Sequence, residues 1–270
     1  MQLTEMRNPK TTHIDKMSVS EIINIINEEN MNSVNAVQNA LPSIEKAIDA
    51  VVDALNNGGR LIYAGAGTSG RLAVVDASEC PPTFGVDYNT VVAVMAGGDR
   101  AIRYAAEGAE DSKEESIKAL NEINITKNDV LMGISASGNA EYVVSAIAYA
   151  KSLGCVTISH SSNDNCRMKD VSDIHIFTDT GAEVVTGSTR MKAGNAQKMV
   201  MNMISTAAMI KTGKVYENLM INLKPTNIKL KDRMVRIVVD ILHIEYDEAL
   251  KLLEDNEFSI REAIANYKGV

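Results

Sequence analysis

A turn rich in glycine and hydroxyl residues, with an acidic residue shortly after it, suggests chemistry more directly than any other feature of this sequence. An apolar run, Leu61–Ala64, leads into Gly65–Gly70, which contains Thr68 and Ser69. A strand that enters a helix through such a turn brings backbone N–H groups and the positive end of the helix dipole to one place, which suits a phosphate. Glu79 follows closely enough for its carboxylate to reach a molecule held there. We therefore expect a phosphate site with a neighbouring acid or base.

The same glycines also satisfy the dinucleotide-binding pattern G-x-G-x-x-G, which is frequent by chance. Two hydroxyl side chains inside the turn argue against that interpretation, because they fill space that a pyrophosphate needs. The dinucleotide pattern also requires an acidic residue about 20 positions further on, at the end of a second strand. Asp87 has nearly that spacing but precedes the next apolar run instead of ending it. The pattern therefore favours a single phosphate.

Two further turns rich in serine follow apolar runs. Ser135, Ser137 and Gly138 come directly after the run at 130–134, and a third turn, 159–163, follows a run that begins at Cys155. A single turn of this kind usually only caps a helix. Several at successive strand ends point to one crevice, because the carboxyl ends of parallel strands converge.

The hydroxyl-rich composition of these turns indicates the kind of phosphate. Thr68, Ser69, Ser135 and Ser137 offer hydroxyl donors, and the turns carry no lysine. Backbone and hydroxyl donors suit a phosphate monoester. The nucleoside-triphosphate pattern G-x-x-x-x-G-K-[ST] does not occur in the sequence. A sugar phosphate is the ligand class that these turns favour.

A fourth block begins at Glu183 and leads into a predicted helix. Ser188 or Thr189 is suited to cap that helix. Arg190 and Lys192 would lie in its first turn, where positive charge opposes the helix dipole. We therefore expect these cations to face an anionic ligand or Glu183.

The elements that position these turns alternate as in a parallel α/β fold. Strands are predicted at 60–64, 91–95, 130–134, 155–159 and 174–177, and helices at 70–77, 99–121, 139–152 and 189–211. An extended arm at 1–16, a helix from Ser18 or Ser20 to Asn27, a helix at 33–56 and three tail helices at 231–242, 246–254 and 258–267 complete the prediction. The strands are short, apolar and rich in β-branched residues, as strands buried on both faces should be.

Composition excludes several classes of protein. The formal net charge is −8, so a nucleic-acid partner is not expected, and the locally basic stretch 224–236 is interpreted as a solvated helix face. No apolar stretch approaches the length of a membrane span or resembles a signal peptide. Three unclustered cysteines and four scattered histidines indicate a reducing, cytoplasmic setting without a disulfide framework, a metal site or a cofactor.

Longer strings in the chain resemble a known family. GAGTSGR and SASGN resemble the sugar isomerase (SIS) domain, a phosphosugar-binding fold. The chain from residue 4 to 212 is similar to the N-acetylmuramic acid 6-phosphate etherase family through TEMRNPKTTHID at 4–15, DASECPPTFG at 76–85, AAEGAEDS at 105–112 and EVVTGSTRMKAGNAQKMVMN at 183–202. The resemblance implies an arm with helices at 1–56, a SIS domain at 57–223 with helices flanking a parallel sheet, and an abbreviated ubiquitin-associated-like helical module at 224–270. It also implies a homodimer.

The same resemblance implies a reaction and its residues. The family removes the D-lactyl ether of N-acetylmuramic acid 6-phosphate in cell-wall sugar recycling, by elimination and water addition, and its two functional glutamates correspond to Glu79 and Glu110. Gly67, Thr68, Ser69, Ser135, Ser137 and Gly138 are the expected substrate-binding residues. From the residues alone, Glu107 and Glu114 are as suitable as Glu110, since all three would lie on one face of the predicted helix. An aldose–ketose isomerase and a non-catalytic sugar-phosphate regulator are the alternatives.

Overall fold

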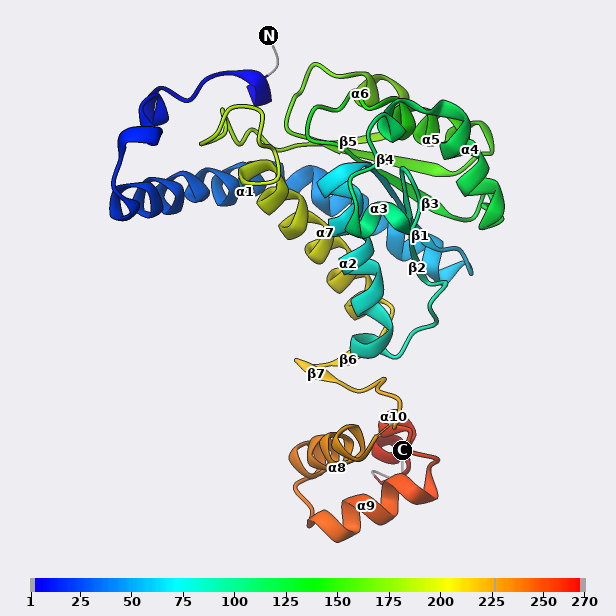
Figure 1. Cartoon of the computed structure of the whole chain (residues 1–270). Helices are drawn as coiled ribbons and strands as arrows, with labels where there is room; N and C mark the ends of the chain where they lie inside the picture. Colours follow the sequence, from blue (N-terminus) through cyan, green and yellow to red (C-terminus); the bar gives the residue numbers. More distant parts are fainter. Residues whose placement is uncertain (1–2, 226, 268–270) are drawn as a thin grey trace. The chain divides into compact units, whose positions relative to one another are not determined.

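A parallel five-stranded sheet organises the structure, a computed structural model that describes residues 3–225 and 227–267 (Figure 1). The strands are β1 (Leu61–Gly65), β2 (Val91–Met95), β3 (Val130–Ile134), β4 (Val156–Ser161) and β5 (Ile174–Phe177). They lie in the order β2-β1-β3-β4-β5, and every side chain of β1 and β3 is buried. The predicted parallel α/β architecture is confirmed, and β4 ends two residues later than predicted.

Helices cover both faces of this sheet, which is why its central strands are apolar throughout. The α-helices are α1 (Val19–Asn56), α2 (Gly67–Phe84), α3 (Arg100–Arg103), α4 (Lys113–Glu122), α5 (Glu141–Ser152), α6 (Arg167–Val171), α7 (Lys192–Lys211), α8 (Ile228–Leu242), α9 (Tyr246–Asp255) and α10 (Ile260–Tyr267). Helices α4, α5 and α6 share one buried apolar cluster with β1, β2 and β3. On the opposite face, α1 packs along β1, β3 and β5.

The first helix is longer than predicted. Instead of two segments, α1 is one helix of 38 residues that continues through Pro42. Ser18, one of the two predicted first residues, begins it with a capping box, in which Ser18 and Glu21 satisfy each other's backbone N–H groups. The expected extended arm is instead a series of 3-10 turns: η1 (Leu3–Glu5), η2 (Pro9–Thr11) and η3 (Ile14–Lys16). Asn8 caps the second turn and ties it to α1 by donating to Glu29 at 2.7 Å.

Helix α2 also extends beyond its predicted end at residue 77. It continues through Pro81 and Pro82 to Phe84, although neither proline can donate the usual helical hydrogen bond. Gly85 ends the helix with φ +63°, and its N–H donates to the Pro81 carbonyl at 2.9 Å. A side chain at Gly85 would also collide with the backbone of Asn222. The helix therefore ends at a glycine in the left-handed region and not at the prolines.

The predicted helix at 99–121 is wrong, because glycine and serine divide that stretch. Gly108, with φ +75°, precedes the 3-10 turn η4 (Ala109–Asp111). Ser112 then begins α4 as an N-cap, accepting from the Glu115 N–H at 3.3 Å. Residues 104–108 are an exposed loop between α3 and η4. This loop lines the candidate site described below.

The chain divides into two units. The first contains the residues up to Ala77 together with Asn89–Ala208, and the second contains Ser78–Tyr88 and the residues from Met209 onward. In the second unit, α8, α9 and α10 pack around an apolar cluster that includes Met234, Leu253 and Ile260. A two-stranded antiparallel ribbon, β6 (Val215–Tyr216) and β7 (Leu219–Met220), precedes them. The predicted three-helix tail is confirmed.

Candidate active site

The topology of the sheet places two of the predicted phosphate loops side by side. From β1 the chain passes to β2 on one side and then to β3 on the other, so the strand order reverses between β1 and β3. Gly65 at the end of β1 pairs with Ile134 at the end of β3, and the loops 66–70 and 135–139 follow directly. A crevice at such a switch point is where open α/β sheets bind ligands.

The first loop brings the start of α2 close to the end of β1. A Cβ atom on Gly65 would lie 2.7 Å from the Gly70 nitrogen, and one on Gly70 would lie 2.8 Å from the Met95 side chain. Gly67 has φ +54° and open space where a side chain would be. The first N–H groups of this 18-residue helix have no intrahelical acceptor, so they are available for an anion.

The two hydroxyls of this loop differ in their surroundings. Thr68 is half-buried at the start of α2, whereas Ser69 is buried and donates to the Gln197 side-chain oxygen at 2.9 Å. Gln197 belongs to α7 and is itself buried, and its Nε2 has no hydrogen-bond partner. Sequence reasoning did not single out Gln197. Its only sequence signal was its place in the string at 183–202.

In the second loop, hydroxyl groups face one another. Ser135 Oγ and Ser137 Oγ are 3.3 Å apart. Ser135 Oγ accepts from the Gly138 N–H and Ser137 Oγ from the Asn139 N–H, both at 3.2 Å. One of the two hydroxyls donates to the other, so one hydrogen remains for a ligand, and Gly138 keeps the turn tight with φ +72°. A side chain on Gly138 would also collide with Cys166.

The serines of the third turn, 159–163, form hydrogen bonds within the protein and do not face the crevice. Residues up to Ser161 belong to β4, and Ser159 Oγ bonds to Ser172 and to His175 Nδ1, each at 2.7 Å. Asn163 donates to the carbonyls of Ala136 and Ser137, so it supports the second loop from beneath. The hydroxyls expected to face a ligand here are buried in the protein instead.

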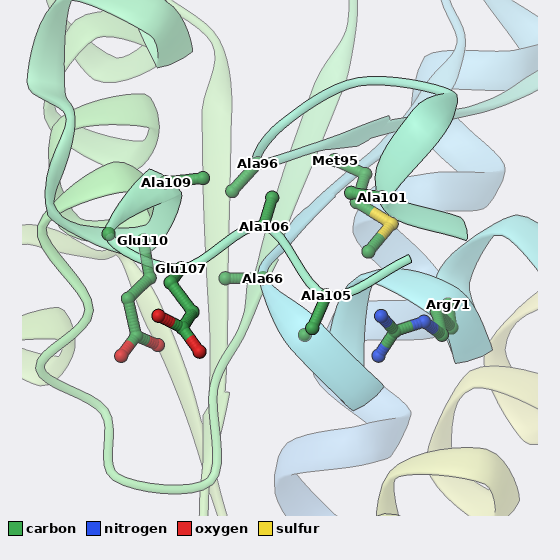
Figure 2. Close-up of a pocket in the computed structure, with 12 residues that line it drawn as sticks. Ala66, Arg71, Met95, Ala96, Ala101, Ala105, Ala106, Glu107, Ala109 and Glu110 are labelled. Atoms are coloured by element: carbon green, nitrogen blue, oxygen red, sulfur yellow. The ribbon is translucent and has the colours of Figure 1, made fainter. Parts of the chain in front are cut away.

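A cavity of about 230 Å³ opens beside the start of α2, within the first unit (Figure 2). Glu107 and Glu110 lie on one side of it, and Arg71 extends from α2 on the other. Gly67 also lines it, and the remaining lining residues are Ala66, Met95, Ala96, Ala101, Ala105, Ala106, Gly108 and Ala109. The cavity therefore combines two carboxylates and one guanidinium with small apolar walls, directly next to the predicted phosphate site.

The structure separates the carboxylates that the sequence treated as equivalent. Glu110 on η4 and Glu107 in the preceding loop share the cavity, although no continuous helix joins them. Glu114 lies on α4 and lines a different hollow with Ile117 and Lys118. Glu79 is an exposed residue of α2 that belongs to the second unit. Arg71 supplies the positive charge among the residues that line this cavity. It ends the string GAGTSGR, but the sequence provided no reason to expect a role for it.

The cations before α7 have a structural role that the sequence did not predict. Glu183, rather than Ser188 or Thr189, caps this helix by accepting from the N–H groups of Lys192 and Ala193 at 3.0 and 2.9 Å. The Lys192 ammonium is buried and pairs with Glu29 of α1 at 2.6 Å. The Lys192 ammonium therefore pairs with Glu29 of α1 and not with a ligand, while the expected relation to Glu183 is present through the Lys192 N–H and a favourable charge interaction.

Titratable groups elsewhere in the first unit do not form a metal centre. Within residues 3–225 and 227–267, no group of three or more His, Cys, Asp or Glu side chains could hold a metal ion. The same described residues contain no helix that is long and apolar enough to span a membrane. Cys80, Cys155 and Cys166 are buried thiols that form no disulfide, and burial raises the pKa of the Cys155 thiol to about 11.

Comparison with known proteins assigns the chain to a family. A protein of Clostridium botulinum strain Hall, named N-acetylmuramic acid 6-phosphate etherase, is 50% identical over 262 residues, covering 97% of this chain and 87% of that protein. The chain belongs to the N-acetylmuramic acid 6-phosphate etherase family. A protein of the same name from Actinobacillus pleuropneumoniae serotype 7 is 48% identical, covering 94% of this chain and 84% of its own length. The family relationship therefore extends over nearly the whole chain.

Other matches concern the SIS part of this etherase-family chain. The family model described as the glucokinase regulatory protein N-terminal SIS domain matches residues 43–151. A phosphoheptose isomerase from Francisella tularensis superposes with a TM-score of 0.53 at 23% identity, covering 73% of this chain and 99% of that one. A protein of Escherichia coli strain CFT073 superposes with a TM-score of 0.54 at 16% identity, covering 75% of this chain and 97% of that one. These likenesses establish the SIS fold.

Proposed function

We propose that this chain is a lyase that converts N-acetylmuramic acid 6-phosphate and water into N-acetylglucosamine 6-phosphate and D-lactate. The observation that carries the proposal is the sequence identity of about half, over almost the entire chain, with proteins named for this activity. The cavity beside α2 supports it, because carboxylates suited to acid–base catalysis lie next to helical N–H groups suited to a phosphate.

The phosphate is assigned to the two loops at the switch point. Gly67, Thr68 and Ser69 offer the N-terminal end of α2, and Ser135, Ser137 and Gly138 offer the turn after β3. Ser69 already donates to Gln197, so the hydrogens left for the phosphate are that of Thr68 and one from the hydrogen-bonded pair Ser135 and Ser137. Alanine at these three positions should raise KM more than it lowers kcat.

The reaction needs one group that begins as a base and one that begins as an acid. Opening of the sugar ring gives an aldehyde at carbon 1, which acidifies the hydrogen at carbon 2. A base removes that proton, the bond from carbon 3 to the ether oxygen breaks, and lactate leaves with a proton from the acid. Water then adds its hydroxyl to carbon 3 and a proton returns to carbon 2. We assign Glu110 to the sugar, as base or ring-opening group, and Glu79 to the lactyl oxygen and then to water.

The test is incubation with N-acetylmuramic acid 6-phosphate in oxygen-18 water, with D-lactate and product mass measured. Lactate release with the label at carbon 3 of the sugar is the expected result. Label in the lactate would show that the other carbon–oxygen bond breaks, which contradicts this mechanism. Saturable binding without turnover would favour a sugar-phosphate regulator, which the match to the glucokinase regulatory protein domain makes the second candidate. Interconversion of aldose and ketose without lactate would indicate an isomerase.

Several further properties belong to the same proposal. The substrate class places the enzyme in cytoplasmic recycling of cell-wall amino sugars. We propose a homodimer, supported by exposed apolar residues along α1. We retain the division into arm and helices at 1–56, SIS domain at 57–223 and a ubiquitin-associated-like module at 224–270, the last supported by its three packed helices.

A further inference from the structure

The cavity beside α2 contains a cation, Arg71, that has no acidic partner within residues 3–225 and 227–267. Arg71 is half-buried, and its Nε donates to the Ile102 carbonyl at 3.0 Å, which anchors the guanidinium. Among the described residues, no carboxylate lies within 4.0 Å of it. Its two terminal nitrogens therefore remain for a ligand, and they point from α2 toward the cavity (Figure 2).

The charges around the cavity restrict where an anionic ligand can lie. Glu107 and Glu110 occupy the opposite side and repel a second carboxylate, whereas Arg71 attracts one. Between these two sides the walls are mainly alanine, which offers no competing polar contact. A ligand with an anionic group and a proton to lose would therefore orient itself with the anion toward Arg71 and the reacting carbon toward the glutamates.

The proposed substrate has two anionic groups, and the phosphate loops account for one. The other is the carboxylate of the lactyl ether, which a planar guanidinium binds through two parallel hydrogen bonds. We propose that Arg71 binds the lactyl carboxylate and so selects the lactyl ether over the same amino-sugar phosphate without it. This inference rests on the proposed function. It adds to the proposed function a residue, Arg71, that would distinguish the substrate from the sugar product.

The test compares two ligands that differ in the lactyl group. Binding of N-acetylmuramic acid 6-phosphate and of N-acetylglucosamine 6-phosphate is measured by calorimetry, with an E110Q background to suppress turnover. R71M should weaken binding of the lactyl-bearing sugar about 10- to 100-fold, as expected for loss of hydrogen bonds to a charged group. It should change binding of the product sugar less than about twofold. R71K keeps the positive charge but lacks the two parallel N–H donors, so its affinity for the lactyl-bearing sugar should lie between those of the parent and R71M.

Two controls keep the result interpretable. Arg103 on α3 does not line the cavity, so R103M should bind both ligands like the parent. A substrate analogue with a carboxamide in place of the lactyl carboxylate should bind the parent about as weakly as the true substrate binds R71M. That comparison needs no change to the protein, so it remains valid if R71M folds poorly.

The contrary outcomes are distinct. Equal weakening of both sugars by R71M would place Arg71 on the phosphate and overturn the inference. Unchanged binding of the lactyl-bearing sugar would also overturn it. Absence of lactate release by the unmodified enzyme would instead refute the proposed function, and the calorimetry would still decide what Arg71 recognises.

Discussion

The acid–base chemistry depends on single carboxylates whose positions differ although their sequence contexts look alike. Glu107, Glu110 and Glu114 follow one another at helical spacing, yet only the first two line the cavity. Gly108 separates Glu107 from η4, and the Ser112 cap begins a new helix, α4, which carries Glu114. Spacing alone could not show which of these glutamates lie at the site, because it assumed one continuous helix, and the chain forms two separate segments there. The resemblance to the family, through the string at 105–112, pointed to Glu110.

Replacing Glu110 by glutamine should therefore reduce lactate release by about 10²-fold or more, the usual contribution of a positioned acid or base. E114Q is the matched control and should keep nearly full activity, since Glu114 lies outside the cavity. E79Q should also abolish lactate release while sugar-phosphate binding persists. Activity is measured as D-lactate formed, and binding by calorimetry. Equal loss in E110Q and E114Q would show a general effect of the negative charge instead.

His160 should make stability depend on pH. It is fully buried on β4, its Nε2 lies 3.0 Å from Thr178 Oγ1, and its Nδ1 has no partner. Burial, aided by His175, lowers its pKa to about 3. The unfolded chain, with a histidine pKa near 6.5, then binds more protons than the folded chain between these values. Stability should be complete above about pH 6.5 and fall below it, by about 2 kcal/mol for this group at pH 5.

Urea unfolding followed by circular dichroism at pH 7.5 and pH 5 measures this loss. H160Q keeps a polar atom toward Thr178 but cannot be protonated, so its stability should fall less on acidification. H13Q is the control, because His13 is exposed. A pH dependence in H160Q as steep as in the parent would contradict the assignment to His160.

At the scale of elements, the strands were easier to predict than the helix ends. A buried parallel strand is an uninterrupted apolar run, so β1, β2 and β3 could be read directly from the sequence. Helix ends depend on backbone conformations and distant caps. Gly85 ends α2 after two prolines, and Glu183 caps α7 from nine residues away. Local sequence offered Ser188 and Thr189 as caps, but tertiary contact decided otherwise.

A buried ion pair joins α1 and α7, and it allows a prediction about stability. Glu29 and Lys192 are 3% and 1% exposed, and although burial raises the pKa of Glu29, hydrogen bonds from Lys192, Lys10 and Asn8 outweigh it and lower the pKa to about 2. K192M should reduce the free energy of unfolding by about 3–5 kcal/mol, because it removes the buried cation and leaves the Glu29 carboxylate with only the exposed Lys10 as its ion-pair partner.

The double variant K192M/E29M should regain much of that loss, since both charges of the buried pair are then removed. K10M is the control and should cost far less, because the Lys10 side chain is 63% exposed. Urea unfolding at neutral pH provides all four values. A double variant less stable than K192M would show that the pair stabilises the junction beyond balancing its own charges.

At the scale of the whole molecule, the sequence predicted the parallel α/β architecture and that the polar turns lie at one edge of the sheet, because the carboxyl ends of parallel strands converge. It did not predict that β3 lies beside β1, since β2 comes between them in the sequence. The sequence did not predict that the third serine-rich segment would be buried, because its burial depends on contacts with other segments that pack against β4. Nor did it identify Gln197, which reaches Ser69 from α7 across 128 residues of sequence. Contacts of that range have no local pattern.

The proposed homodimer is the property of the whole molecule that a surface can test. Val19, Ile23, Val34 and Leu41 are exposed on α1 at 75%, 59%, 47% and 37%. At 100° per residue they fall within about 60° around the helix, so they form one apolar stripe. A stripe of this kind on a soluble helix indicates a contact with another chain. We expect a second copy to cover it, given the family relationship.

Sedimentation equilibrium should therefore show a dimer for the unmodified chain. Glutamates placed on the stripe, in I23E/V34E, should shift the equilibrium to monomer by burying like charges in the contact. Ile228, 87% exposed on α8, supplies the control, and I228E should remain dimeric. If I23E/V34E stays dimeric and I228E does not, the interface lies on the helical tail. Because η2 and η3 precede α1 directly, loss of the contact should also leave the N-terminal turns more accessible to protease, which limited proteolysis of the same variants measures.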